Sequence, residues 1–356
     1  MSANLPRRIL VVGPSWVGDM VMAQTLFSAL RQQHPDCVID VLAPDWSRPI
    51  LERMPEVHAA LSLPFGHGEL RLGERRQQGK SLIGHYDQAI VLPNSLKSAL
   101  LPFWAKIPQR TGWRGEMRYG LLNDVRVLDK QAYPLMVQRF VALALPANAP
   151  VPTREQIVAP HLQVDPGKAD AARRQLGLSQ SLPVMALCPG AEFGPAKRWP
   201  DAHYAALATK QLQEGWQVWI FGSAKDREVA DLIVAQVPEK YRGRVKILAG
   251  ETSLAEAVDL MAQVNVVVSN DSGLMHIAAA LDRPLVAIYG STSPQFTPPL
   301  SRHVEICRLG LDCSPCFERE CPLGHINCLN QLMPEQVFAA VQKVSKAIHV
   351  ADWRDQ

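Results

Sequence analysis

Short apolar runs alternate along the chain with polar turns and with longer segments of helical periodicity. Runs rich in Val, Ile and Leu occupy residues 9–13, 38–43, 86–92, 183–188, 217–221, 266–268 and 285–290. An apolar run of this length, bounded by turn residues and followed by an amphipathic segment, is typical of a buried strand in a βαβ unit. Because the pattern repeats in both halves of the chain, it predicts an α/β fold with two Rossmann-like, doubly wound domains that face a central cleft.

One of these units, around residue 270, favours a binding site. The run Val266–Val268 stops at a polar turn, and a helical segment of small apolar residues follows. Asp271 or Ser272 is the expected N-cap of that helix, whose free N–H groups lie at the carboxyl end of the strands, where open α/β sheets bind ligands. Polar capped turns occur in every βαβ unit, but here Asp271 and His276 flank Gly273, which favours a turn that holds a ligand.

Composition narrows the class of protein. The chain has 356 residues, 47% of them hydrophobic and 20% charged, as expected for two folded domains. A proline-rich stretch at 146–160 predicts a linker between an N-terminal domain (1–150) and a C-terminal domain (151–332), with a final helix (333–356) near the domain junction. No run is long enough to span a bilayer and no signal peptide is apparent, so we expect a cytoplasmic protein without a transmembrane segment. The net charge of +3 gives no reason to expect a nucleic-acid partner.

The first apolar run opens a Rossmann-like unit that carries an acidic residue. The unit lacks the G-x-G-x-x-G spacing, so we expect no dinucleotide there. Asp19 stands at the mouth of the unit, near the start of its helix. It either complements the positive end of that helix or takes part in chemistry, and the local sequence leaves both open.

Three arginines recur at four-residue spacing between residues 107 and 119. Arg110, Arg114 and Arg118 are interleaved with Trp113 and Tyr119 in a segment with two glycines, which favours a loop or an irregular strand edge. Guanidinium groups beside aromatic rings suit the recognition of phosphates, carboxylates and sugars. Solvated surface charge is the alternative.

Five motifs, in order along the chain, are similar to those of a known family. They are Gly13–Asp19 (GPSWVGD), Leu92–Ser98 (LPNSLKS), Arg110–Tyr119 (RTGWRGEMRY), Pro189–Pro200 (PGAEFGPAKRWP) and Ser269–His276 (SNDSGLMH). On these motifs the chain resembles glycosyltransferase family 9 over nearly its whole length. The resemblance implies a GT-B fold, ADP-L-glycero-D-manno-heptose as the donor, and inverting transfer to heptosyl-Kdo2-lipid A at the inner-membrane surface, in lipopolysaccharide synthesis.

The same resemblance implies roles for individual residues. Asp19 is then the general base for the attacking sugar hydroxyl, and Lys197 the cation that stabilises the leaving ADP. Asp271 accepts hydrogen bonds from the donor heptose, whereas His276 is either a ligand or a core histidine. The expected donor-binding residues are Gly190, Lys197, Ser223, Asp226, Asp271, Ser272, Gly273 and His276, and the expected acceptor-binding residues are Asn94, Lys97, Arg110, Trp113, Arg114 and Arg118.

Two adjacent positions depart from the family pattern. Relatives that add the first heptose carry threonines where this chain has Ala191 and Glu192. Backbone N–H groups around Gly190–Gly194 are therefore expected to replace hydroxyl contacts with phosphate.

Four of the seven cysteines have the spacing of a small metal site, C-x2-C-x4-C-x6-C. Cys313, Cys316, Cys321 and Cys328, with His325 among them, either bind a structural zinc or iron–sulfur centre or simply pack in a loop. The resemblance implies that transfer itself needs neither a metal nor a cofactor, because cations of the protein balance the diphosphate.

Two other functions remain open on the sequence. A nucleotide-sugar or ADP-binding module without turnover would keep Lys197 and Asp271 but would have no use for Asp19. A transferase of the same fold could instead use another donor or acceptor.

Overall fold

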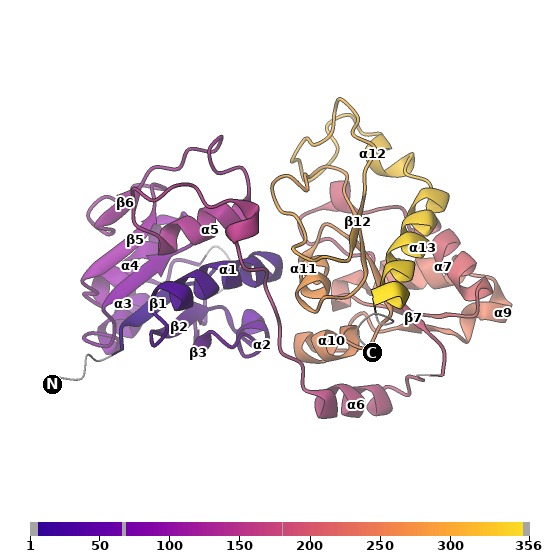
Figure 1. The fold of residues 1–356 in the computed structure, drawn as a ribbon, viewed down its shortest axis with the longest axis horizontal. Helices are drawn as coiled ribbons and strands as arrows, with labels where there is room; N and C mark the ends of the chain where they lie inside the picture. Colours follow the sequence, from indigo (N-terminus) through magenta and orange to yellow (C-terminus); the bar gives the residue numbers. More distant parts are fainter. Residues whose placement is uncertain (1–5, 66–68, 180, 352–356) are drawn as a thin grey trace. The chain divides into compact units, whose positions relative to one another are not determined.

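The computed structural model describes residues 6–65, 69–179 and 181–351, which form two compact units, Met1–Pro160 and His161–Gln356. Each unit is a layered α/β structure with a parallel sheet of its own (Figure 1). No helix within these described ranges is both long and apolar enough to cross a membrane.

The first unit is built on a six-stranded parallel sheet with the order β3-β2-β1-β4-β5-β6. The chain adds β2 and β3 on one side of β1 and then returns to add β4, β5 and β6 on the other. This is the doubly wound order that the sequence predicts. The strands are β1 (Arg8–Val12), β2 (Val38–Ala43), β3 (Val57–Ser62), β4 (Gln88–Val91), β5 (Gln109–Trp113) and β6 (Asp124–Arg126).

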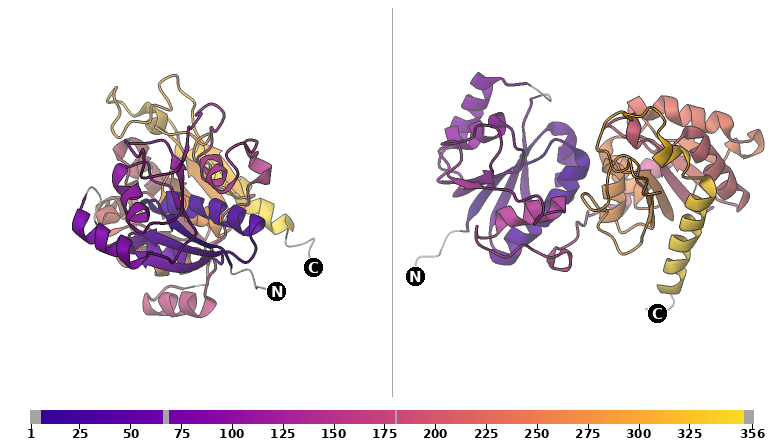
Figure 2. Two further views of the ribbon diagram at one scale, coloured as in Figure 1. Left: turned by 90° about the vertical axis from the view of Figure 1, so that its left-hand side faces the viewer. Right: turned by 90° about the horizontal axis from the view of Figure 1, so that it is seen from above.

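Helices cover both faces of this sheet, as Figure 2 shows. Leu10 and Val12 of β1 belong to the apolar cluster beneath α4, and since side chains alternate along a strand, Ile9 and Val11 point to the opposite face. Helix α1 packs against α2 and α5, while α3 packs against α4. The helices are α1 (Val17–Gln33), η1 (Asp45–Ser47), α2 (Arg48–Leu51), α3 (Leu72–Ser81), α4 (Leu96–Trp104), α5 (Met136–Ala144) and η2 (Arg154–Gln156).

The second unit repeats the plan with the order β12-β11-β10-β7-β8-β9. Counted from its own first strand, this is the same doubly wound order, and it reverses between β7 and β10. The predicted α/β fold class with two Rossmann-like halves is therefore confirmed. The strands are β7 (Val184–Cys188), β8 (Gln217–Ile220), β9 (Val245–Ile247), β10 (Val266–Asn270), β11 (Leu285–Ile288) and β12 (Val304–Cys307).

The core of the second unit lies around two fully buried aromatic side chains, Trp199 and Tyr204, which pack edge to face with ring centroids 4.8 Å apart. The final helix α13 packs against β10, β11, β12 and α7 of this unit. Its place near the domain junction stays a prediction. Residues 352–356 of the predicted final helix lie outside the described ranges. The helices are α6 (Pro166–Gln175), η3 (Pro195–Lys197), α7 (Asp201–Gln213), η4 (Ala224–Asp226), α8 (Arg227–Gln236), α9 (Glu239–Arg242), α10 (Leu254–Met261), α11 (Gly273–Ala280), α12 (Asn327–Asn330) and α13 (Pro334–Ala351).

The arginine-rich segment differs from its prediction, because it contains β5, an internal strand with neighbours on both sides. A Cβ on Gly112 would lie 2.9 Å from the Leu122 side chain and 3.2 Å from the Val91 carbonyl oxygen. The prediction of a loop or strand edge is wrong for Gln109–Trp113, because a glycine inside a strand can mark close packing rather than a turn, but residues 114–118, which include Arg114 and Arg118, do form a loop. The short strands β6 and β12 carry charged residues and have no apolar run that predicts them.

Candidate functional site

In each sheet the strand order reverses at one point, and in open α/β sheets ligands bind at the carboxyl ends of the strands beside that point. In the first unit the point lies between β1 and β4, whose following loops lead to Asp19 and Lys97. In the second unit it lies between β7 and β10, whose following loops carry Lys197 and Asp271. Strand topology therefore puts the main predicted residues of each unit at the ligand-binding edge of its own sheet.

Lys197 and Asp271 form a sheltered ion pair at this edge of the second sheet. Lys197 ends the short helix η3, Asp271 follows β10 directly, and Nζ lies 2.6 Å from Oδ2. Only 14% of the lysine side chain and 5% of the aspartate side chain are exposed. The hydroxyl of Thr292, in the loop after β11, donates to the same Oδ2 at 2.6 Å. A cation and an anion held out of bulk water interact more strongly than a surface pair.

Asn270 holds both ends of the loop that carries Lys197. Its side chain is fully buried; Nδ2 donates to the Pro189 carbonyl at 2.7 Å, and Oδ1 accepts from the Trp199 amide at 3.1 Å. The Tyr204 hydroxyl donates to the same Oδ1 at 3.0 Å. Pro189 begins the loop and Trp199 ends it, so one amide side chain fixes the path that brings Lys197 to Asp271.

The segment with the four clustered cysteines closes one side of this loop. The Arg319 carbonyl accepts a hydrogen bond from the Ala196 amide at 3.0 Å. A Cβ on Gly194 would lie 2.4 Å from that carbonyl oxygen, so glycine is required at this close approach. The Phe193 ring lies 5.0 Å from Lys197 Nζ and 5.4 Å from the Arg319 guanidinium, so the ring shields the lysine from one side.

The first turn of α11 lacks a side-chain cap. Ser272 is the N-cap residue, as predicted, but it makes no capping hydrogen bond, and Asp271 is engaged by Lys197. The first N–H groups of α11 therefore have no side-chain acceptor at Gly273, which is the arrangement that suits a bound anion.

His276 lies one turn further along α11 and is 5% exposed. Burial lowers the pKa of its imidazole to about 4, with Asp271 raising it and Lys197 lowering it. The ring is therefore neutral near pH 7, and it lies close enough to the ion pair to sense both charges.

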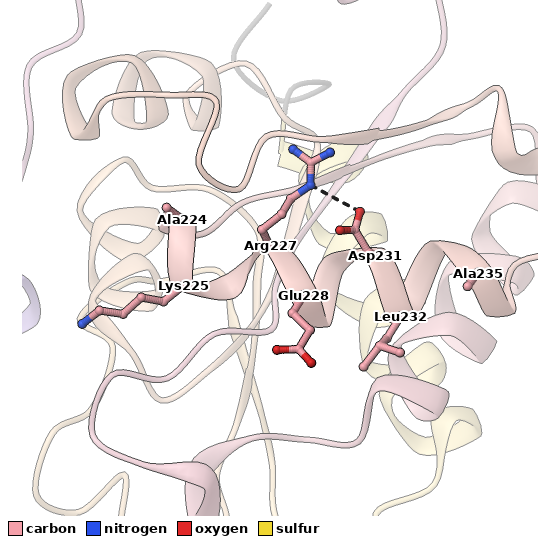
Figure 3. A pocket seen from close by; sticks show the side chains of 7 residues that line it. All are labelled: Ala224, Lys225, Arg227, Glu228, Asp231, Leu232 and Ala235. Carbon is pink, nitrogen blue, oxygen red and sulfur yellow. Dashed lines mark hydrogen bonds and ion pairs between the residues drawn. The ribbon is translucent and has the colours of Figure 1, made fainter.

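The predicted donor-binding residues Ser223 and Asp226 bind each other in this structure. Asp226 Oδ2 accepts from the Ser223 amide and from its hydroxyl, each at 2.8 Å. A Cβ on Gly190 would lie 2.5 Å from the same carboxyl group, so Gly190 brings the end of β7 against it. Nearby, Figure 3 shows a hollow beside α8 that none of the predicted donor residues lines; its walls are Ala224, Lys225, Arg227, Glu228, Asp231, Leu232 and Ala235.

In the first unit, Asp19 is half-buried in the first turn of α1, whose N-cap residue Trp16 makes no side-chain cap. A carboxylate at this point is favoured by the helix dipole. The capping role and the catalytic role that the sequence left open are therefore compatible.

The predicted acceptor residues fall into two groups by whether backbone carbonyls bind their side-chain donors. Arg118 is 2% exposed and donates to the carbonyls of Pro93 and Trp113 and to Asn94 Oδ1. Arg110 likewise donates to backbone carbonyls, and the Trp113 indole donates to another. By contrast Asn94 and Arg114 are exposed and Lys97 is half-exposed, so these three have side chains within reach of a ligand. Trp113 also lines a hollow of about 260 Å³ in this unit, together with Asp124, Arg126 and Tyr133.

The clustered cysteines are all free thiols, and in the described ranges no three His, Cys, Asp or Glu side chains are arranged to hold a metal ion. Burial, and then the neighbouring Cys313, Cys316 and Cys321, raise the pKa of the Cys328 thiol, so the four thiols lie near one another, and metal binding by them stays a prediction. Backbone hydrogen bonds, from Ile326 first and from its neighbours, lower the pKa of the Cys321 thiol. Cys37, Cys188 and Cys307 are buried, as their apolar surroundings in the sequence indicate.

Three residues of the second unit were missed by the sequence reasoning: Asn270, Thr292 and Phe193. Asn270 is the last residue of β10 and Thr292 lies in the loop after β11, both at the ligand-facing edge, so a polar side chain at a strand end was the available signal. No local pattern marks Phe193, because its role depends on a lysine and an arginine that the fold brings to its ring.

Comparisons with known proteins identify the family of the chain. Residues 75–327 match the family described as glycosyltransferase family 9 (heptosyltransferase). The chain is 52% identical over 335 residues to lipopolysaccharide heptosyltransferase 2 of Salmonella typhimurium, covering 93% of this chain and 96% of that one. It is 54% identical over 307 residues to lipooligosaccharide heptosyltransferase 2 of Haemophilus influenzae, covering 85% and 88%. The solved structure of E. coli ADP-heptose lps heptosyltransferase II is similar at a TM-score of 0.86 and 48% identity, covering 96% of this chain and 99% of that one. The chain therefore belongs to glycosyltransferase family 9, and it is a glycosyltransferase with the two-domain GT-B fold.

Proposed function

We propose that this enzyme transfers L-glycero-D-manno-heptose from ADP-heptose to heptosyl-Kdo2-lipid A, with inversion at the anomeric carbon, in assembly of the lipopolysaccharide inner core. The name of the Salmonella typhimurium relative, 52% identical over 93% of this chain, supports the reaction. The description of the similar E. coli structure supports ADP-heptose as the donor. The observation on this chain that carries the proposal is the Lys197–Asp271 pair at the strand-order reversal of the second sheet.

In this mechanism the second unit binds the donor. Lys197 leaves Asp271 for the donor diphosphate and neutralises the charge that develops when the bond from the anomeric carbon to the diphosphate oxygen breaks and ADP departs with the electron pair. Asp271 then accepts hydrogen bonds from heptose hydroxyls. The uncapped first turn of α11 at Ser272 and Gly273, and backbone N–H groups near Gly190, supply further positive ends of dipoles to the phosphates.

The first unit supplies the base and binds the acceptor. Asp19 takes the proton of the acceptor hydroxyl while that oxygen forms its bond to the anomeric carbon. A general acid is not needed, because a diphosphate leaves as a stable anion. Asn94, Lys97 and Arg114 bind the anionic inner-core acceptor, while the buried Arg118 holds the loop of Asn94 in place. Because the acceptor is a lipid, the reaction takes place at the cytoplasmic face of the inner membrane.

The test is release of ADP when the enzyme is incubated with ADP-heptose and heptosyl-Kdo2-lipid A. We expect Asp19→Asn to lower turnover about 100-fold or more, because the amide cannot accept the proton. Asp36→Asn, at an exposed turn after α1, is the matched control and keeps normal turnover. Near-normal turnover of Asp19→Asn would refute the assignment of the base, and absence of ADP release by the unmodified enzyme would refute this choice of donor and acceptor.

The assignment of acceptor residues has a separate test. Lys97→Ala and Arg114→Ala are expected to raise KM for the acceptor and to leave the affinity for ADP-heptose unchanged. An equal loss of donor affinity would show that the two units do not divide the substrates as proposed.

A further inference from the structure

The carboxylate of Asp271 is held from two sides by residues of different elements. Lys197 Nζ and Thr292 Oγ1 both lie 2.6 Å from its Oδ2. No hydrogen bond within the described ranges engages Oδ1, which leaves that oxygen to a ligand. The two donors on Oδ2 orient the carboxylate, and Oδ1 stays available as a hydrogen-bond acceptor.

The backbone around this contact is fixed before any ligand binds. The Asp271 amide donates to the Ile288 carbonyl at 3.0 Å, which extends the ladder between β10 and β11 by one residue. The carbonyls of Gly290 and Ser291, directly before Thr292, accept hydrogen bonds from the Ser314 hydroxyl at 2.6 Å and the Phe317 amide at 2.7 Å. The position of the Thr292 hydroxyl is therefore set by the sheet on one side and by the cysteine-bearing segment on the other.

Donor binding, as proposed above, creates a difficulty that Lys197 alone cannot resolve. When its ammonium turns to the diphosphate, the 5% exposed carboxylate of Asp271 loses its cation. A buried carboxylate without a partner is strongly disfavoured, so the ion pair resists opening unless another donor remains on the oxygen. Thr292 is the remaining donor to Oδ2 in the described structure.

We propose that Thr292 is a positioning residue of the donor site, whose hydroxyl holds the Asp271 carboxylate in place while Lys197 exchanges that carboxylate for the donor diphosphate. The inference rests on the proposed function, because it needs a donor with a diphosphate and sugar hydroxyls. Thr292 acts through Asp271 in both the bound and the reacting complex, so its loss weakens binding of the donor more than it slows the chemical step.

The isosteric variant Thr292→Val tests this, with KM for ADP-heptose, kcat, and the dissociation constant of ADP-heptose measured without acceptor. We expect KM and the dissociation constant to rise about 10-fold or more, since a hydrogen bond to a charged group is lost, with kcat changed by less than about threefold. Thr292→Ser keeps the hydroxyl and is expected to restore both constants. Ser293→Ala is the matched control, because that hydroxyl belongs to the same loop but accepts from the Gln295 amide instead of donating to Asp271.

A double-mutant cycle separates action through Asp271 from a general effect on the loop. In an Asp271→Ala background the hydroxyl has no carboxylate to hold, so Thr292→Val should add nothing to the loss of donor affinity. The same additional loss in both backgrounds would overturn the inference, as would donor binding by Thr292→Val that equals the unmodified enzyme. If the unmodified enzyme neither binds nor uses ADP-heptose, the proposed function and this inference fall together. If it does both and Thr292→Val is normal, the inference alone falls.

Discussion

Replacing Asn270 by alanine should destabilise the second unit substantially, because one buried amide satisfies three other groups. The Trp199 amide and the Pro189 carbonyl would each lose their partner in buried surroundings, whereas the Tyr204 hydroxyl keeps the Cys188 carbonyl at 3.4 Å. Leaving one buried polar group unpaired costs about 1 to 3 kcal/mol, so two such groups predict a loss of about 2 to 6 kcal/mol in the free energy of unfolding. For a unit of this size that corresponds to a fall of at least about 4 °C in Tm.

Thermal and urea unfolding followed by circular dichroism measure this loss. Tyr204→Phe is the matched variant, since it removes the hydroxyl bonded to Asn270 at 3.0 Å but leaves the other two contacts intact, and it should cost only about 1 kcal/mol. If Asn270→Ala lowered the free energy of unfolding no more than Tyr204→Phe does, Asn270 would not be holding the Lys197 loop. The same variant should also weaken ADP-heptose binding, because the loop that presents Lys197 is released at both ends.

Three further predictions concern His276, Arg118 and the thiols. The pKa of His276 in the folded enzyme, about 4, lies below its ordinary value of about 6.5. Between these two pH values the unfolded chain binds a proton at His276 and the folded enzyme does not, so the free energy of unfolding falls as the pH is lowered. His276→Leu should therefore reduce by about 2 kcal/mol the fall in the free energy of unfolding between pH 7.5 and 5, measured by urea unfolding. Arg118→Met should lower Tm together with activity, whereas loss of activity at unchanged Tm would indicate that the guanidinium contacts the acceptor directly. In the native enzyme a thiol reagent at pH 7.5 should modify Cys321 first, because the pKa of its thiol is lowered. Rapid modification of the buried cysteines Cys37, Cys188 and Cys307 in the native enzyme would contradict the structure.

Most of the fold is readable from local patterns. The buried strands β1, β2, β7, β10 and β11 are built on short apolar runs, interrupted in β2 by Asp40, so their positions follow from local pattern. The capping box of Ser253 and Glu256 at the start of α10 is likewise a local pattern, because its two residues are three positions apart. For a few other strands the prediction is wrong or missing, for one physical reason. Glycine and charged side chains are compatible with a strand when a neighbouring strand or an aliphatic side-chain stem covers them. β5 and β6 are examples.

For the candidate site, the sequence indicates which residues matter but not which of them touch or are exposed. Asp271 and Lys197 stand out in motifs, but whether they touch each other is a property of strand order, since they are 74 residues apart. Among the arginines, the sequence spacing treats Arg114 and Arg118 alike, yet one is exposed and the other 2% exposed. Exposure depends on the loop path after β5, which local periodicity does not contain.

By itself, the sequence determined where most of the strands and helices lie, which residue types stand at the strand ends, and the family to which the motifs are similar, because each of these depends on neighbours within about ten positions. Only the tertiary structure decided that Lys197 pairs with Asp271, that Thr292 shares the same carboxylate oxygen, and that Asn270 ties the Lys197 loop to β10. These contacts join residues between 21 and 81 positions apart. They arise because parallel strands bring their carboxyl ends to one edge of the sheet in an order that differs from their order in the chain.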